Sequence, residues 1–399
     1  MSKKQQTAII GGGAAGFFCA VNLKEMCPQM GVTIFESGTK VLRKVAVSGG
    51  GRCNCTNTFA DVTDLSQVYP RGHRLLKRLF NVFDYRDAYR WFEQHGVPLT
   101  VQDDHCVFPQ AQDSHAIIDC FLREARRHGV EIRTSHKVNS LEELSNFDYV
   151  VVTTGGITDG IPLFTTHHSL LTKPCPSLFT FRVADEALTA LMGTVVEQAQ
   201  VMLPSTKMRA AGPLLITHWG MSGPAILRLS SYAARLLAEC RYQHPLSINW
   251  TGCGEAAVMD TLGELVVREG KKQLPNVRPF DLPGRLWEYL TAKSLQGRAH
   301  APWGSLNTKE LNRLVNVLVN DQYRIAGRAP FRDEFVTCGG VELSAVHPRT
   351  LESRQRRGLY FAGEVLDIDG VTGGFNFQAA WTTAYVVAQS IVADVGNVP

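Results

Sequence analysis

The fold of this chain is decided near its end, by Gly358-Leu-Tyr-Phe-Ala-Gly-Glu364 and the following Gly373-Gly-Phe-Asn-Phe-Gln378. This stretch reads as an apolar strand that ends in Gly-Glu and leads into a glycine turn, a form that lets a backbone pass close to a ligand. A second glycine-rich loop lies near the other end, in Ile9-Ile-Gly11-Gly-Gly13-Ala-Ala-Gly16. A lone GxGxxG motif is a weak signal, but the two stretches together predict one dinucleotide site built from both chain ends.

The N-terminal glycine loop lies inside a predicted strand–helix–strand unit, with strands at 7–10 and 32–35 and a helix at 14–26. Glycines let the backbone approach a pyrophosphate, and the helix N-terminus supplies N–H groups and partial positive charge. Glu36 follows Gly16 by 20 residues, the spacing at which a carboxylate accepts hydrogen bonds from an adenosine ribose. The alternative is an ordinary strand–turn–helix without a ligand, but strand, turn, helix and acid in register favour the cofactor.

A further glycine loop follows in Lys44-Val-Ala-Val-Ser48-Gly-Gly-Gly51-Arg52-Cys53-Asn54. Its glycines and its Ser, Arg and Asn neighbours offer backbone donors and positive charge, which suit a flavin or its phosphates. The alternative is a flexible surface loop. The apolar run 148–154 ends in Gly155-Gly156, which predicts a buried parallel strand whose end passes close to the cofactor.

Length and composition indicate a globular protein of two or three domains, since 399 residues exceed one ordinary core. Hydrophobic residues make up 44% and charged residues 20%, which excludes extensive disorder. The net charge of +4 permits a polyanionic partner without requiring one. The ten cysteines include no zinc-type spacing, so we expect reduced thiols and no metal site. No apolar run of about 18 residues predicts a membrane span, and a cytoplasmic location follows by default.

The residue pattern of the sequence changes after Gly156. Prolines punctuate short alternating runs such as 177–183, which predict antiparallel strands, and 256–320 has a helical pattern. The predicted class is α/β, with a Rossmann-like FAD-binding domain formed by both chain ends, an inserted β-rich domain and a small helical subdomain. The expected bounds are 1–165 for the first part of the FAD-binding domain, 166–255 for the β-rich domain, 256–320 for the helical subdomain, 321–334 for a return segment and 335–399 for the second part of the FAD-binding domain.

Basic and aromatic residues alternate over 71–96, in a segment that we expect to form amphipathic helices. Solvated helix faces explain this composition. A polyanion-binding face is the sharper interpretation, because basic residues interleaved with aromatic ones suit nucleic acid.

With these blocks in place, the chain resembles the BaiN/RdsA family of FAD-dependent oxidoreductases, flavoproteins with two dinucleotide folds, some described as aminoacetone-oxidase-like. The resemblance rests on blocks spread over nearly the whole chain, at 11–16 with Glu36, 44–57, 150–156, 217–224 and 339–378. The most specific are Ser-Gly-Gly-Gly-Arg-Cys-Asn and the block that runs from Gly-Glu to Phe-Asn-Phe-Gln. One departure follows Gly156: members usually continue with Ser-x-Pro and a longer Gly-Asp-Gly-Tyr segment, whereas 155–162 runs almost directly into the β-rich domain.

The resemblance implies an FAD site in which the first loop holds the pyrophosphate and Glu36 holds the ribose. Residues 363–364 would address the ribityl and phosphate region, 374–376 would place a helix N-terminus near the flavin pyrimidine, and 48–50 would lie near flavin N5. The residues assigned to FAD are Gly11, Gly13, Ala15, Gly16, Glu36, Lys44, Ser48, Gly49, Gly50, Arg52, Gly155, Gly363, Glu364, Gly374, Phe375 and Asn376.

No separate NAD(P)H fingerprint is present, so we expect the nicotinamide to dock transiently over the flavin. The spacing of Cys53 and Cys55 fits disulfide chemistry poorly. The resemblance implies reduction of a ribosomal RNA uridine to dihydrouridine, with hydride going to C6 and a proton to C5. Cys53 and His218 are the candidate proton donors, although either can equally be a structural residue.

The partner expected on this reading is ribosomal RNA, contacted by the basic tract 71–90 and the four arginines of 349–357. Two alternatives stay open. One is a reductase or oxidase of a small enone-like or amine substrate with the same fold, and the other is a non-catalytic flavin-binding protein.

Overall fold

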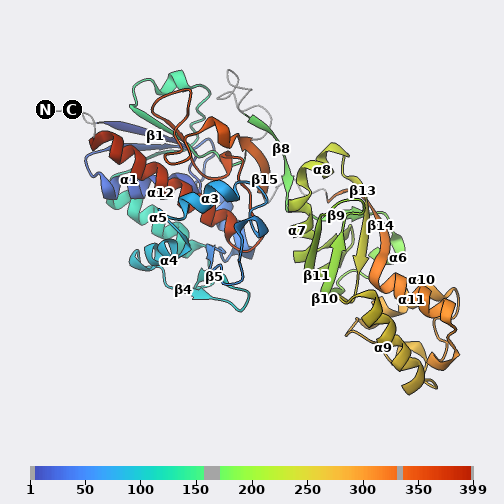
Figure 1. Cartoon of the computed structure of the whole chain (residues 1–399). Helices are drawn as coiled ribbons and strands as arrows, with labels where there is room; N and C mark the ends of the chain where they lie inside the picture. Colours follow the sequence, from blue (N-terminus) through green and yellow to red (C-terminus); the bar gives the residue numbers. More distant parts are fainter. Residues whose placement is uncertain (1–4, 157–170, 330–335, 397–399) are drawn as a thin grey trace. The chain divides into compact units, whose positions relative to one another are not determined.

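The computed structural model describes residues 5–156, 171–329 and 336–396, and the chain forms two compact units (Figure 1). Unit 1 consists of residues 1–175 and 336–399, and unit 2 consists of residues 176–335. The departure at 157–162 and the expected domain boundaries near 165 and 334 lie outside the described residues, so the domain bounds stay a prediction.

Unit 1 is built on a parallel sheet of five strands in the order β16-β7-β1-β2-β6. Its strands are β1 (Gln6–Ile10), β2 (Gly31–Phe35), β6 (Glu131–Arg133), β7 (Tyr149–Val152) and β16 (Leu359–Phe361). The central strands read as apolar runs because both faces of the sheet are covered. Strand β16 pairs in parallel with β7, with Leu359 opposite Val150, so both chain ends contribute to one sheet.

Helices α1 and α12 pack against each other in unit 1 (Figure 1). Both helices are buried over much of their length. Phe18 on α1 and Trp381 on α12 are in contact, with their ring centroids 5.1 Å apart. The helices of the unit are α1 (Ala14–Met26), α2 (Arg43–Val47), α3 (His73–Leu79), α4 (Tyr85–Gln94), α5 (His115–Arg127) and α12 (Phe375–Gly396). Its further strands are β3 (Thr56–Asn57), β4 (Leu99–Val101) and β5 (Cys106–Pro109) in one antiparallel sheet, and β15 (Val336–Val341), which pairs with β8 (Leu171–Ser177).

Unit 2 is a closed barrel in the order β10-β11-β12-β9-β14-β13, with helices packed on it. Its strands are β9 (Phe181–Val183), β10 (Val195–Met202), β11 (Arg209–Thr217), β12 (Gly220–Ser222), β13 (Gln243–Asn249) and β14 (Asp321–Arg328). Its helices are α6 (Glu186–Thr189), α7 (Pro224–Tyr232), α8 (Ala234–Glu239), α9 (Glu255–Arg268), α10 (Gly284–Leu295) and α11 (Thr308–Asn320).

Two details of unit 2 differ from a simple reading of the sequence. The run 177–183 is divided between β8 and β9, because Leu178 has a left-handed backbone (φ 57°) that ends the first strand. The expected return segment contains β14, which lies between β9 and β13 in the barrel. Its residues alternate between buried and exposed, as a strand with one covered face requires.

The predicted α/β class, with a Rossmann-like domain formed by both chain ends and a separate β-rich part, is confirmed. All ten cysteines are free thiols. Within the described part of the chain, no helix has both the length and the apolar character that crossing a membrane requires.

Candidate cofactor site

The carboxyl ends of four parallel strands meet at one edge of the unit 1 sheet. Gly11 N, after β1, donates to Phe35 O at the end of β2 (2.8 Å), and Ala362 N, after β16, donates to Val152 O at the end of β7 (3.1 Å). Ligands of open α/β sheets bind at this edge, in the crevice outside the strand ends. The fold therefore brings the glycine loop, Glu36, the Thr-Gly-Gly turn and the Gly-Glu turn to one place.

The glycines of the first loop divide into two kinds. Gly11 has φ 112°, and a Cβ there would lie 2.4 Å from Thr153 O; a Cβ on Gly16 would lie 2.1 Å from Gly11 O. The protein itself therefore requires these two glycines. Gly13 is different, because its backbone is extended and a Cβ there meets no atom within 4 Å.

Gly13 is also the N-cap of α1, and no side chain caps this helix end. The first N–H groups of a helix lack partners within the helix, and they carry partial positive charge. A pyrophosphate fits such an end when the approach is open. The open space above Gly13 and the uncapped helix therefore fit the group that the sequence predicts.

Glu36 is fixed at the end of β2 by backbone donors. Its Oε2 accepts from Gly12 N (2.9 Å) and its Oε1 accepts from Gly38 N (2.7 Å). Oε1 also accepts from Ser37 Oγ (3.3 Å). Each carboxylate oxygen has about two lone-pair positions, so Oε2 is the oxygen that can still accept a hydrogen bond from a ribose.

A second carboxylate joins three parts of the chain that are far apart in sequence. Lys44 Nζ lies 2.7 Å from Glu364 Oε2, and Thr337 N donates to Glu364 Oε1 (2.8 Å). A Cβ on Gly155 would lie 3.6 Å from Glu364 Oε2, so the Thr-Gly-Gly turn passes beside the same group. The sequence indicated Lys44, Gly155 and Glu364 but not Thr337, because a backbone donor leaves no signature in its side chain.

The turn before α12 is held by β3 and by Asn54, two residues before that strand. Gly374 has φ 85°, and a Cβ there would lie 2.3 Å from Thr56 O. Asn57 Nδ2 donates to Gly373 O (3.0 Å), and Thr56 Oγ1 donates to Gln378 Oε1 (2.6 Å). With its amide oriented to satisfy both ends, Asn54 donates to Thr56 O and accepts from Gly374 N. The Ser-Gly-Gly-Gly-Arg-Cys-Asn block and the C-terminal block therefore form one structure.

Two residues assigned to FAD use their side chains inside the protein. The Asn376 amide bonds to both Gly370 N (2.8 Å) and Gly370 O (2.9 Å), closing the loop before α12. Phe375 is buried, and its carbonyl accepts from Tyr69 OH (2.7 Å). Both residues can therefore offer a cofactor the backbone N–H groups at the start of α12, but not their side chains.

An ion pair between Arg71, two residues before α3, and Asp369 supports the loop before α12. Arg71 donates through Nε and Nη2 to the two oxygens of Asp369, and the Asp369 side chain has 0% exposure against 12% for Arg71. Arg71 lies in the basic tract that the sequence suggested for RNA. The structure instead gives its guanidinium an internal partner.

The loop at 48–51 carries three consecutive glycines with positive φ, at 56°, 68° and 85°. Ser48 Oγ donates to Val45 O (2.8 Å), which ties the loop to α2. Arg52 lies with its guanidinium carbon 4.4 Å from the centroid of the Phe108 ring and donates to Gln112 Oε1 (3.3 Å).

The two candidate proton donors lie in different units. Cys53 follows the glycine loop in unit 1 with 0% exposure, and burial raises the pKa of its thiol to about 12 against a smaller opposing effect of a Ser48 hydrogen bond. This thiol holds its proton at neutral pH. His218 is exposed on the turn between β11 and β12 in unit 2, 4.7 Å from Trp219 between ring centroids.

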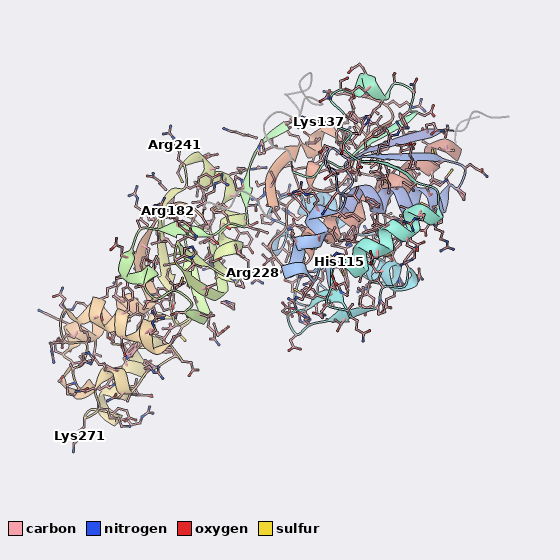
Figure 2. The ribbon with its side chains drawn as sticks, turned by 180° about the vertical axis from the view of Figure 1, so that it is seen from behind. His115, Lys137, Arg182, Arg228, Arg241 and Lys271 are labelled. Carbon is pink, nitrogen blue, oxygen red and sulfur yellow. The ribbon has the colours of Figure 1, made fainter. Side chains whose placement is uncertain are left out.

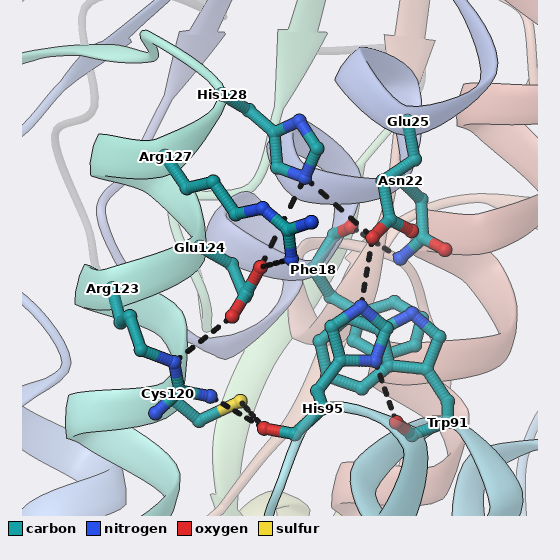
Figure 3. A network of polar contacts seen from close by, with 10 residues as sticks. All are labelled: Phe18, Asn22, Glu25, Trp91, His95, Cys120, Arg123, Glu124, Arg127 and His128. Carbon is teal, nitrogen blue, oxygen red and sulfur yellow. Dashed lines mark hydrogen bonds and ion pairs between the residues drawn. The ribbon is translucent and has the colours of Figure 1, made fainter.

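A polar network outside the strand-end edge connects α1, α4 and α5 (Figure 3). His95 Nδ1 contacts Trp91 O (2.6 Å) and Nε2 contacts Glu25 Oε1 (2.7 Å); burial lowers the His95 pKa, but these two acceptors outweigh it and leave it raised. Ligand atoms of Glu25, His95 and Glu124 lie within 4.8 Å of one another, the spacing of a metal site. Arg127 pairs with Glu124 (3.4 Å), however, so side chains already balance its charge.

Taken together, the parallel sheet, the glycine loop on an uncapped helix, and the acidic and glycine turns at the strand ends define an FAD-dependent oxidoreductase. The chain belongs to the family described as HI0933-like protein Rossmann domain, whose model matches residues 5–390. The BaiN/RdsA resemblance is thereby confirmed.

Three relatives match almost the whole chain. Proteins named ribosomal RNA dihydrouridine synthase, from Haemophilus influenzae and from Escherichia coli K12, are 29% and 28% identical to it; the matches cover 98% and 96% of this chain and 99% and 97% of theirs. A protein from Clostridium scindens named 3-dehydro-bile acid delta(4,6)-reductase is 25% identical, over 96% of this chain and 98% of its own.

Proposed function

We propose that this protein uses FAD and NAD(P)H to reduce a uridine of ribosomal RNA to dihydrouridine. The observation that carries the proposal is the end-to-end similarity to two relatives named ribosomal RNA dihydrouridine synthase. Exposed basic side chains on both units support a polyanionic partner. Because the proposed substrate is ribosomal RNA, we expect the protein in the cytoplasm.

FAD would be held by the groups that converge at the strand ends. The uncapped end of α1 at Gly13 would receive the pyrophosphate and Glu36 the ribose. The Lys44–Glu364 pair would lie along the ribityl chain, and the N–H end of α12 would face the pyrimidine ring. Bound FAD supplies hydride transfer, from a transiently docked nicotinamide and then to the acceptor.

Reduction of uridine adds a hydride at C6 and a proton at C5. Cys53 and His218 are the proposed proton donors. Cys53 is proposed because it directly follows the glycine loop, and its thiol is protonated at neutral pH. His218 is exposed and can exchange protons with solvent.

Exposed basic residues supply a surface for the phosphates of RNA. On unit 1 they include Arg74, Lys77, Arg78, Arg349, Arg354, Arg356 and Arg357. On unit 2 they include Arg182, Arg228, Arg241 and Lys271 (Figure 2). Each phosphate contact releases counterions, so the affinity for RNA should fall steeply as salt rises.

A small-molecule reductase or oxidase is the second candidate, and the Clostridium scindens relative favours it. That function predicts turnover without RNA and a weak dependence of substrate affinity on salt. A non-catalytic flavin protein is the third candidate, and it predicts yellow protein that never oxidises NADPH.

The proposal predicts that ribosomal RNA from a strain lacking this gene has lost a dihydrouridine. Mass spectrometry of the digested RNA measures the loss, and a plasmid carrying the wild-type gene should restore the modification. Dihydrouridine that is unchanged in the deletion strain contradicts the proposal. Complementation with Cys53→Ala and with His218→Ala separates the proton donors, since the variant that retains FAD yet restores no dihydrouridine has lost the donor.

A further inference from the structure

A small cavity of about 230 Å³ lies in unit 1 between α4 and the β3–β5 sheet. Sites for drug-sized ligands have volumes of about 300–1,000 Å³, so this cavity suits a single ring-bearing group better than a whole dinucleotide. It is lined by Thr56, Asn57, Thr58, Tyr85, Arg86, Tyr89, Arg90 and Val107.

Helix α4 gives this cavity two aromatic rings and two cations. Tyr85 and Tyr89 are four residues apart, as are Arg86 and Arg90, so each pair lies along one helix face. Tyr85 is fixed by stacking on Phe59, with ring centroids 5.0 Å apart and planes at 22°. The Arg86 guanidinium carbon also lies 5.2 Å from the centroid of the Tyr85 ring, so Tyr85 already has partners inside the protein. Tyr89 is held by its hydroxyl, which donates to Leu99 O (3.4 Å). A ring that is held in place stacks on a base at little entropic cost.

The two arginines differ in their partners. Arg90 pairs with Asp87 on the same helix. Arg86 Nε donates to Tyr85 OH (3.1 Å), and no carboxylate of the described residues lies within ion-pairing distance of its guanidinium. Arg86 is exposed at the rim of the cavity, where it is available to an anion.

We propose that this cavity is a nucleotide subsite for single-stranded RNA, with a base against Tyr89 and a phosphate on Arg86. The inference rests on the proposed function and adds a specific contact site to it. A polymer is favoured over a free nucleotide because helix α3, five residues before α4, carries three more exposed cations, Arg74, Lys77 and Arg78.

The test measures binding of a fluorescent RNA pentamer to FAD-loaded protein by anisotropy. We expect Tyr89→Ala and Arg86→Ala each to weaken binding about tenfold, through loss of stacking and of a phosphate contact. Tyr89→Phe keeps the ring and should bind within about twofold of wild type. Arg126→Ala removes an exposed arginine of α5 outside the cavity and serves as the matched control. FAD content of each variant reports on folding.

A second arm measures anaerobic reduction of the flavin by NADPH, which should be unchanged in Tyr89→Ala. If the variant loses NADPH reduction and keeps RNA affinity, the cavity serves the nicotinamide nucleotide and the proposal is overturned. If wild type binds RNA and forms dihydrouridine while both alanine variants bind equally well, the subsite alone is wrong. Wild-type protein that binds no RNA overturns the subsite and the proposed function together.

Discussion

The Gly13→Val variant should purify as folded but colourless protein. A Cβ on Gly13 meets no protein atom within 4 Å, and the extended backbone there accepts any residue. We therefore expect the fold to tolerate the substitution. A branched side chain would occupy the space in front of the uncapped end of α1, where we place the pyrophosphate. Flavin absorbance per protein measures the loss, and circular dichroism measures the fold.

The control for this variant is Gly16→Val, which should damage the fold itself. A Cβ on Gly16 would lie 2.1 Å from Gly11 O, a distance that cannot be relieved by moving a flexible side chain. The two substitutions are the same chemically and lie three residues apart. If Gly13→Val retains its full complement of FAD, the placement of the cofactor on α1 is wrong.

The Arg71→Met variant should lose about 3–5 kcal/mol of unfolding free energy, because it leaves the buried carboxylate of Asp369 without its guanidinium. The loss should reach the cofactor as well, since Asp369 lies next to Gly370, whose backbone the Asn376 amide holds in the loop before α12. We therefore expect reduced FAD content together with the lower stability. Urea denaturation and flavin absorbance measure the two effects.

Arg74→Met is the matched control for Arg71→Met, because Arg74 is an exposed arginine three residues along. Its unfolding free energy should stay within about 0.5 kcal/mol of wild type. Equal stability of the two variants would show that the Arg71–Asp369 pair contributes nothing to the fold.

The sequence was most informative where structure is local. The helix expected at 14–26 is α1 with the same bounds, since glycines before it and an apolar run within it are signals of neighbouring residues. Glu36 likewise follows the second predicted strand directly and lies at the end of β2, because the strands and helix of such a unit are neighbours in sequence.

Long-range pairings could not be predicted in this way. Arg71 had the appearance of a surface charge, and only the folded chain shows its partner, Asp369, 298 residues away. Thr337 acts through a backbone N–H that any residue provides. The place of β14 in the barrel depends on strands β9 and β13, which no pattern inside 321–328 identifies.

The most direct test of the account is the identity of the acceptor that reoxidises the reduced flavin. FAD-loaded protein is reduced with NADPH in the absence of air and then mixed with unmodified ribosomal RNA or with aerated buffer, while flavin absorbance is followed by stopped flow. We predict that the RNA returns the flavin to its oxidised form and gains dihydrouridine in the same reaction. Flavin that stays reduced with RNA and is reoxidised only by air would contradict the proposed function.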